Sequence, residues 1–228
     1  MQVTLDKRIS DGFSVYASYT FSKTFDNSSE NKQTGATVTN PADIEFDWGP
    51  SNADRRHRFV ASWLYELPSM QQPALNAVLG DWALTGILTL QSGAPFNVTS
   101  GADNARTGTG GQRADQVGDP ILSSDRTRDE IVRQYFNTSA FVANALGTFG
   151  NIGRNSLVGP GYANVDIGLH KNFPVTQSVR IQFRAEAFNL FNRVNFDNPN
   201  SDRSSANFGR ILTAKDPRIL QFALRASF

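Results

Sequence analysis

The stretch SVRIQFRAEA, residues 178–187, decides the fold class of this chain. Its apolar residues alternate strictly with polar ones, and the polar row is Arg180, Gln182, Arg184 and Glu186. A period of two is typical of a β-strand that has one apolar and one polar face. Four such polar groups in a dry core would each need a partner or cost several kcal/mol. We therefore interpret the row as facing water, in the lumen of a barrel.

The same alternation recurs along the chain, whereas helical periodicity is scarce. In residues 13–24, for example, aromatic and apolar residues occupy every second position from Phe13 to Phe21. We predict about seven strands, at residues 2–8, 13–24, 58–67, 81–91, 164–171, 178–187 and 218–228. We also predict one short helix within residues 125–136, where Ile131, Val132 and Tyr135 are suitably spaced.

The connections between these strands differ in length in a regular way. The short or medium ones are residues 9–12, 68–80 and 172–177, and the long polar ones are 25–56, 92–163 and 195–217. Bacterial outer-membrane barrels combine short periplasmic turns with long extracellular loops, and their strands of about ten residues span the bilayer. We predict an all-β fold: an antiparallel, up-and-down portion of a transmembrane β-barrel, an open curved sheet by itself, with long extracellular loops. A soluble β-sandwich that binds carbohydrate stays open as an alternative, although long structureless loops count against it.

Composition excludes several classes of function. The 228 residues include 22 Lys and Arg, 21 Asp and Glu, and no Cys. Without cysteine, a disulfide framework, an iron–sulfur site and a thiol nucleophile are excluded. The mean hydropathy of −0.37 and the lack of a long apolar run argue against a membrane-spanning helix. A net charge of +1 gives no general attraction to nucleic acid, so we expect no nucleic-acid partner.

Two loop features resemble ligand sites but lack the required spacing. The glycine-rich run at 101–118 has no lysine where a phosphate-binding loop needs one, so we interpret it as a flexible surface loop. Asp103, Asp115 and Asp119 offer the oxygen ligands that Ca²⁺ prefers, but not in the order of a calcium-binding loop. Whether these carboxylates bind calcium stays open.

The histidines suggest neither a metal site nor an enzyme. His57 and His170 lie in different predicted strands, without the short spacing of zinc ligands. Asp54, His57 and a serine would supply the groups of a hydrolase, but no G-x-S-x-G turn accompanies them. We expect no enzymatic activity and no cofactor.

The basic run at 55–58 is expected at the external rim of the barrel, where arginines can pair with lipopolysaccharide phosphates.

Large aromatic residues mark the ends of several predicted strands. We interpret Tyr19, Trp63, Tyr65 and Trp82 as parts of aromatic girdles, because amphipathic rings favour the level of the lipid headgroups. Trp82 and the terminal Phe228 would belong to the periplasmic girdle. In a sandwich the same rings would simply fill the interior.

Several longer stretches carry a family resemblance. DRRHRFVASWLYELP (54–68), GTFGNIGRN (147–155), GPGYANVDIGLHKNF (159–173) and RIQFRAEAFNLFN (180–192) resemble, in order and spacing, the barrel of Oar-like TonB-dependent outer-membrane transporters. The final LQFALRASF (220–228) resembles the signal that the barrel-assembly machinery reads, carried by Phe222, Leu224, Ala226 and Phe228.

The resemblance implies that the chain is the C-terminal segment of a larger receptor. Barrels of that family have about 22 strands around a plug domain. The signal peptide, the regulatory-like domain, the TonB box and the plug would all precede Met1. The implied function is uptake of an unidentified ligand across the outer membrane of a Gram-negative cell. The implied partners are outer-membrane lipid, the rest of the parent barrel and plug, the TonB system and the barrel-assembly machinery. An outer-membrane structural or adhesive protein acting through its loops is the alternative.

Overall fold

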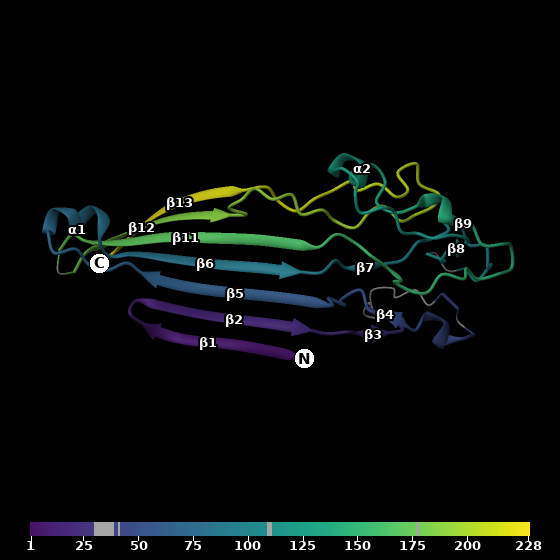
Figure 1. Ribbon diagram of the computed structural model, residues 1–228, viewed down its shortest axis with the longest axis horizontal. Helices are drawn as coiled ribbons and strands as arrows, with labels where there is room; N and C mark the ends of the chain where they lie inside the picture. The colour runs from purple at the N-terminus through teal and green to yellow at the C-terminus, as the bar shows by residue number, and fades with distance from the viewer. Residues whose placement is uncertain (30–38, 41, 109–110, 177) are drawn as a thin grey trace.

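Seven long strands form the main sheet of the protein, and the computed structural model shows it as a single layer (Figure 1). The structure describes residues 1–29, 39–40, 42–108, 111–176 and 178–228. Neighbouring strands are antiparallel and follow one another along the chain, so the sheet is an up-and-down meander as expected. In sheet order the strands are β1 (Gln2–Ser10), β2 (Phe13–Phe21), β5 (His57–Glu66), β6 (Trp82–Gln91), β11 (Tyr162–Pro174), β12 (Arg180–Phe188) and β13 (Ile219–Ser227).

The register joins the apolar sides of all these strands into one continuous apolar face. Tyr19 pairs with Phe59, and Phe59 pairs with Leu90 on its other side. Further along the sheet, Phe183 pairs with Leu224. The residues between them in sequence form the opposite, polar face. Because a slip of one residue would turn every side chain of a strand to the other side, the alternation in the sequence specifies this register strongly.

The strand β11 is longer than the expected 164–171. It pairs with β6 over residues 162–171 and with β12 over residues 167–174, and these two registers are staggered. The pattern of one strand alone does not reveal such a stagger. The other main strands agree with the prediction apart from their ends, of which the C-terminal end of β2 differs most. There, the amide of Thr24 binds the Asp54 side chain at 2.8 Å instead of continuing the strand.

Connections of different length gather at opposite ends of the sheet (Figure 1). The β1–β2, β5–β6 and β11–β12 connections lie at one end, called here the turn end. The β5–β6 connection contains a helix that the sequence analysis did not predict, α1 (Pro73–Leu79). The long connections lie at the other end, where they form what we call the cap: residues 22–29, 39–40, 42–56, 92–108, 111–161 and 189–218.

The cap contains short elements rather than bare loops. Two-residue strands pair as β3 (Phe25–Asp26) with β4 (Gly49–Pro50), β7 (Pro95–Phe96) with β10 (Leu157–Val158), and β8 (Asp115–Gln116) with β9 (Phe141–Val142). The helices are η2 (Ile44–Asp47), α2 (Arg128–Arg133) and η3 (Thr138–Ala140). The helix α2 confirms the expected helix but is shorter than 125–136, because the Thr127 and Glu130 side chains form a capping box that fixes its start.

The hydrophobic core lies in the cap and not against the sheet. Its buried members are Phe96, Val98, Ala114, Phe136, Ala140, Phe141 and Ile152. The rings of Phe136 and Phe208 meet edge to face with their centroids 5.2 Å apart. The expectation of a flexible surface loop at 101–118 is wrong for residues 112–114, since Gln112, Arg113 and Ala114 are buried and Ala114 belongs to this core.

The main sheet is open. Its outermost strands β1 and β13 each pair on one side only. Among the described residues the other three sheets are all two-stranded, so no second large sheet packs on the main one as a sandwich requires. In the described part of the chain, the helices are all too short or too polar to cross a bilayer.

Candidate functional site

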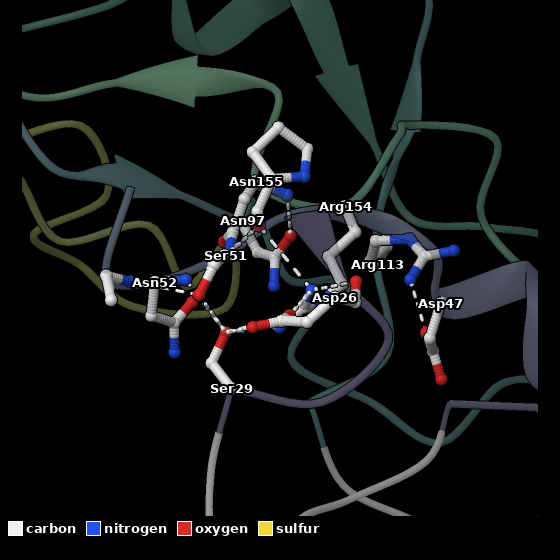
Figure 2. A network of polar contacts seen from close by, with 11 residues as sticks. Asp26, Ser29, Asp47, Ser51, Asn52, Asn97, Arg113, Arg154 and Asn155 are labelled. Atoms are coloured by element: carbon white, nitrogen blue, oxygen red, sulfur yellow. Dashed lines mark hydrogen bonds and ion pairs between the residues drawn. The ribbon is translucent and has the colours of Figure 1, made fainter. Parts of the chain in front are cut away.

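Arg154 connects the second long loop to the first at the centre of a polar network in the cap (Figure 2). Its guanidinium donates to the backbone oxygen of Asp26 at 2.7 Å, to the carboxylate of Asp26 and to the Ser29 hydroxyl at 2.7 Å. That hydroxyl donates to the same carboxylate at 3.0 Å and accepts from the amide of Asn52 at 2.8 Å. Arg154 therefore links the second long loop to residues 26–29 of the first, and Ser29 continues the network to Asn52.

The neighbouring Asn155 extends the network. Its side-chain amide donates to the Pro50 oxygen at 2.7 Å and to the Asn52 side chain at 2.6 Å. The backbone amide of Asn155 donates to the side chain of Asn97 at 2.5 Å. The backbone of Asn155 has a φ of 50°, a left-handed conformation that asparagine tolerates better than most residues. We call the contacts of Arg154 and Asn155 with the first loop the latch.

A buried ion pair lies beside the latch. Arg113 donates to the Asp47 carboxylate at 2.6 Å, and both side chains are 4 % exposed. The remaining guanidinium nitrogens donate to the backbone oxygens of Phe46 and Ile152 at 2.8 and 2.9 Å, and Asp47 also accepts from the Thr39 amide. The charges are thus fully hydrogen-bonded, which a buried pair requires.

Electrostatics favour the ionised form of the latch carboxylate. Burial by itself raises the pKa of Asp26, but hydrogen bonds from Ser51, Arg154 and Ser29, together with the positive charge of Arg154, lower that pKa overall below its usual value. The latch is therefore intact at neutral pH and is expected to weaken in acid.

On the polar face, the strands carry a connected set of hydrogen bonds. Arg184 donates to Nδ1 of His170 at 3.0 Å, so Nε2 of the neutral ring carries the proton and donates to Thr85 at 3.1 Å. Arg184 also lies 3.7 Å from Glu186, and Gln182 donates to Asn172 at 3.0 Å. Arg180, Gln182, Arg184 and Glu186 all lie on this face, opposite the apolar one.

Where the polar face meets the cap, the surface is hollowed by a pocket of about 510 Å³. Tyr162 and Phe188 contribute aromatic rings, while Asp166, Asp197 and Lys215 contribute charge. Lys215 pairs with Asp197 at 2.6 Å, and this hydrogen bond, with a further one from Thr213, lowers the pKa of Asp197. The pocket combines apolar rings with hydrogen-bonding groups, as sites for small polar ligands do.

The four residues predicted to form girdles lie on the apolar face, at different positions between the cap and the turn end. Tyr19 lies towards the cap, where its hydroxyl is 2.7 Å from the ring of His57. Tyr65 and Trp82 lie towards the turn end of β5 and β6. Trp63 is set further in, with its ring over Gly86 of the neighbouring strand. Their position at the headgroup level stays a prediction.

The structure places the last strand's apolar residues together. Phe222, Leu224 and Ala226 pair with apolar residues of β12 on the apolar face, and Phe228 follows the end of β13 fully exposed. Their role in barrel assembly stays a prediction.

The other candidates from the sequence have separate local partners. Asp103, Asp115 and Asp119 accept hydrogen bonds from the amides of Gly108, Asn151 and Ile121 respectively. Within the described ranges, no three acidic or histidine side chains are grouped to hold a metal ion. Asp54 binds the Thr24 amide and His57 binds Tyr19, so these two side chains are engaged with different partners.

Arg154, Asn155 and the Arg113–Asp47 pair were not predicted as a site. Arg154 and Asn155 do lie in the stretch 147–155 that carries the family resemblance, and this was the available signal for them. The Arg113–Asp47 pair joins residues 66 positions apart, and the sequence pattern held no sign of it.

A single-layer sheet with one apolar and one polar face, short turns at one end and a folded cap at the other defines an outer-membrane β-barrel protein. The chain belongs to the outer membrane beta barrel domain family, whose model matches residues 1–221, and its location is the outer membrane. Searches among curated proteins and among solved structures gave no significant match. By the loop-length rule of such barrels, the turn end is periplasmic and the cap is extracellular.

Proposed function

We propose that this chain is the C-terminal barrel segment of an Oar-like TonB-dependent receptor that takes up a ligand across the outer membrane. The observation that carries the proposal is the continuous polar face that leads from a pocket beneath the cap towards the periplasmic end. Such a face is suited to an aqueous path or to contact with a plug, whereas lipid would solvate it poorly.

The open sheet is consistent with a role as part of a larger barrel. Unpaired edge strands in lipid leave backbone groups without hydrogen bonds, at a cost of several kcal/mol per group. The free edges of β1 and β13 therefore need further strands. We propose that the parent protein supplies these strands and the plug.

Energy coupling provides the first test. In cells that make the intact parent protein, chemical crosslinking is expected to give an adduct with TonB, and a strain without TonB serves as the control. An intact receptor that gives no adduct would overturn the proposal. If no adduct forms, steady ion conductance through the protein in planar bilayers would indicate a passive pore. A protein with neither adduct nor conductance would favour the adhesive alternative, acting through its cap.

The second test asks whether the polar row lines water, and residues 1–228 contain no cysteine that would react beside an introduced one. Glu186 and Ala187 are adjacent in β12, both half-buried and on opposite faces. We expect a membrane-impermeant maleimide to label Glu186→Cys in intact outer membranes and to leave Ala187→Cys unlabelled. Equal labelling of both positions, or the reverse order, would contradict a polar lumen and with it the transport proposal.

A further inference from the structure

The β5–β6 connection, with α1, lies at the turn end of the sheet (Figure 1), and its contacts are with residues of the apolar face. Two contacts place it there. The indole of Trp82 donates to the backbone oxygen of Val78 at 2.9 Å, and the ammonium of Lys171 donates to the oxygen of Asn76 at 2.9 Å. Trp82 and Lys171 pair with each other in the sheet and share the apolar face. The helix α1 therefore lies beside the seven-stranded main sheet, called here the wall, and not beneath the barrel.

The connection presents an uncharged, largely apolar surface. Residues 67–80 contain no acidic or basic side chain, and Met70, Leu75, Val78 and Leu79 are exposed. A helix of seven residues in water is marginal even with favourable residues, and an exposed apolar one gains nothing from water.

Two polar side chains of the connection, Ser69 and Asn76, are used internally. The side chain of Asn76 accepts from the Met70 amide at 2.6 Å and donates to Asp81 at 2.7 Å. Ser69 donates to the other oxygen of Asp81 at 2.6 Å. These partners tie the two ends of the connection together. Of its outward side chains, Gln71 and Gln72 precede α1, and Leu75, Val78 and Leu79 belong to α1.

Lys171 gives the second, independent observation. The register places this cation beside Trp82 and Phe183 on the apolar face, and it is only 2 % exposed. Its ammonium donates to the oxygens of Asn76 and Gly80 at the C-terminal end of α1, where the helix dipole favours a positive charge. The rings of Trp82 and Phe173 lie 5.5 and 5.4 Å from it. A lysine in water needs no such oxygen and ring partners for its ammonium, whereas a lysine beside lipid does.

We propose that α1 is an interfacial helix that lies in the periplasmic leaflet of the outer membrane, with phospholipid as its partner. Leu75, Val78 and Leu79 reach the boundary of headgroups and acyl chains, and Lys171 holds the helix against the wall. On the apolar face the rings of Trp82 and Phe183 are 6.1 Å apart, and the indole of Trp82 binds the helix at Val78. The inference rests on the outer-membrane location of the family and is independent of the transport proposal.

Site-directed spin labelling tests the proposal. Val78→Cys would carry a nitroxide in the protein reconstituted in vesicles of phosphatidylethanolamine and phosphatidylglycerol. Val78 is 64 % exposed, so the label does not disturb a core, and Val117 of the cap is a matched control at 62 %. Accessibility to oxygen, which concentrates in lipid, is compared with accessibility to a water-soluble nickel chelate. Leu224→Cys on the apolar face gives the lipid reference, and Ser178→Cys in the β11–β12 turn gives the aqueous reference at the same end.

We expect the ratio of oxygen to nickel accessibility at position 78 to resemble that at 224 and to exceed that at 117 and 178 several-fold. A ratio at 78 equal to those at 117 and 178 would overturn the proposal. Lys171→Met supplies a second measurement, because loss of the ammonium leaves the Asn76 and Gly80 oxygens without this donor. We expect a more mobile label at position 78 in that variant, and an unchanged spectrum would contradict the role of Lys171.

Discussion

The wall and the cap of this protein are stabilised in different ways. Among the described residues, every buried hydrophobic side chain lies outside the seven strands of the wall, and most belong to the core of the cap. The wall has a large exposed apolar face instead, because lipid replaces a protein interior there. The cap faces water and needs what a soluble domain needs, namely a core and satisfied buried charges. The two parts therefore respond to different substitutions.

The largest effect is expected for the buried ion pair of the cap. Arg113→Met leaves the Asp47 carboxylate buried without its cation, which typically costs about 3–5 kcal/mol. Hydrogen exchange followed by mass spectrometry is expected to show lost protection in cap peptides and unchanged protection in wall peptides.

The double variant Arg113→Met with Asp47→Leu is the control for that prediction. Removing both charges is expected to recover much of the lost protection, although the oxygens of Phe46 and Ile152 still lose their donor. If the single variant also released the wall strands, the cap and wall would form one cooperative unit and the comparison above would be wrong.

The wall is expected to respond most to a charge on its apolar face. Leu224→Arg places a cation near the middle of β13, and such a change costs about 2–4 kcal/mol at the bilayer midplane. Arg225→Leu, one position further on the polar face, is expected to cost much less. Urea unfolding in lipid vesicles gives both free energies, and equal losses for the two variants would contradict the assigned faces.

A smaller effect is expected where two wall strands approach closely. A Cβ atom on Gly86 would lie 2.1 Å from the ring of Trp63, so Gly86→Ala forces the ring off the sheet. We expect a loss of about 1–3 kcal/mol, as for other overpacked sites. Gly153→Ala in the cap would place its methyl 3.9 Å from the Ser156 side chain, an ordinary van der Waals contact, and is expected to change stability by less than about 0.5 kcal/mol. A similar cost at both positions would indicate that the packing of Trp63 is not responsible.

The contrast between wall and cap also explains how much the sequence could predict. Each wall residue faces lipid or the polar side according to its parity alone, so alternation located all seven strands and their faces. The cap core depends on Phe96, Phe136, Phe141 and Phe208, which come from three separate stretches of the chain and follow no period. The helix α1 was missed because a helix of seven residues gives too few positions for a helical period, although Pro73 stands at its first position, where proline is favoured.

The candidate site was predictable only in its wall part. The polar row of β12 follows directly from alternation, because the residue types at every second position define it. The latch depends on one arginine binding a loop more than a hundred residues earlier, and no local pattern encodes that pairing. The resemblance of 147–155 to a family segment marked the right residues without indicating their partners.

The smallest effect is expected from protonation of the latch. The folded-state pKa of Asp26 lies below its unfolded value, so its contribution to stability is present above the unfolded pKa, about 4, and is lost as the pH falls through the folded-state pKa. Exchange of cap amides near residues 26–29 and 50–52 is therefore expected to accelerate in this acid window beyond its chemical rate. Asp26→Asn is expected to remove this pH dependence. Asp197→Asn tests whether each carboxylate acts only on its own loop. The pKa of Asp197 is also lowered, by Lys215 in the third long loop, so this variant should change the pH dependence of amide exchange in that loop only. An acid response near Asp26 that persists in Asp26→Asn would assign the response to another carboxylate and separate it from the latch.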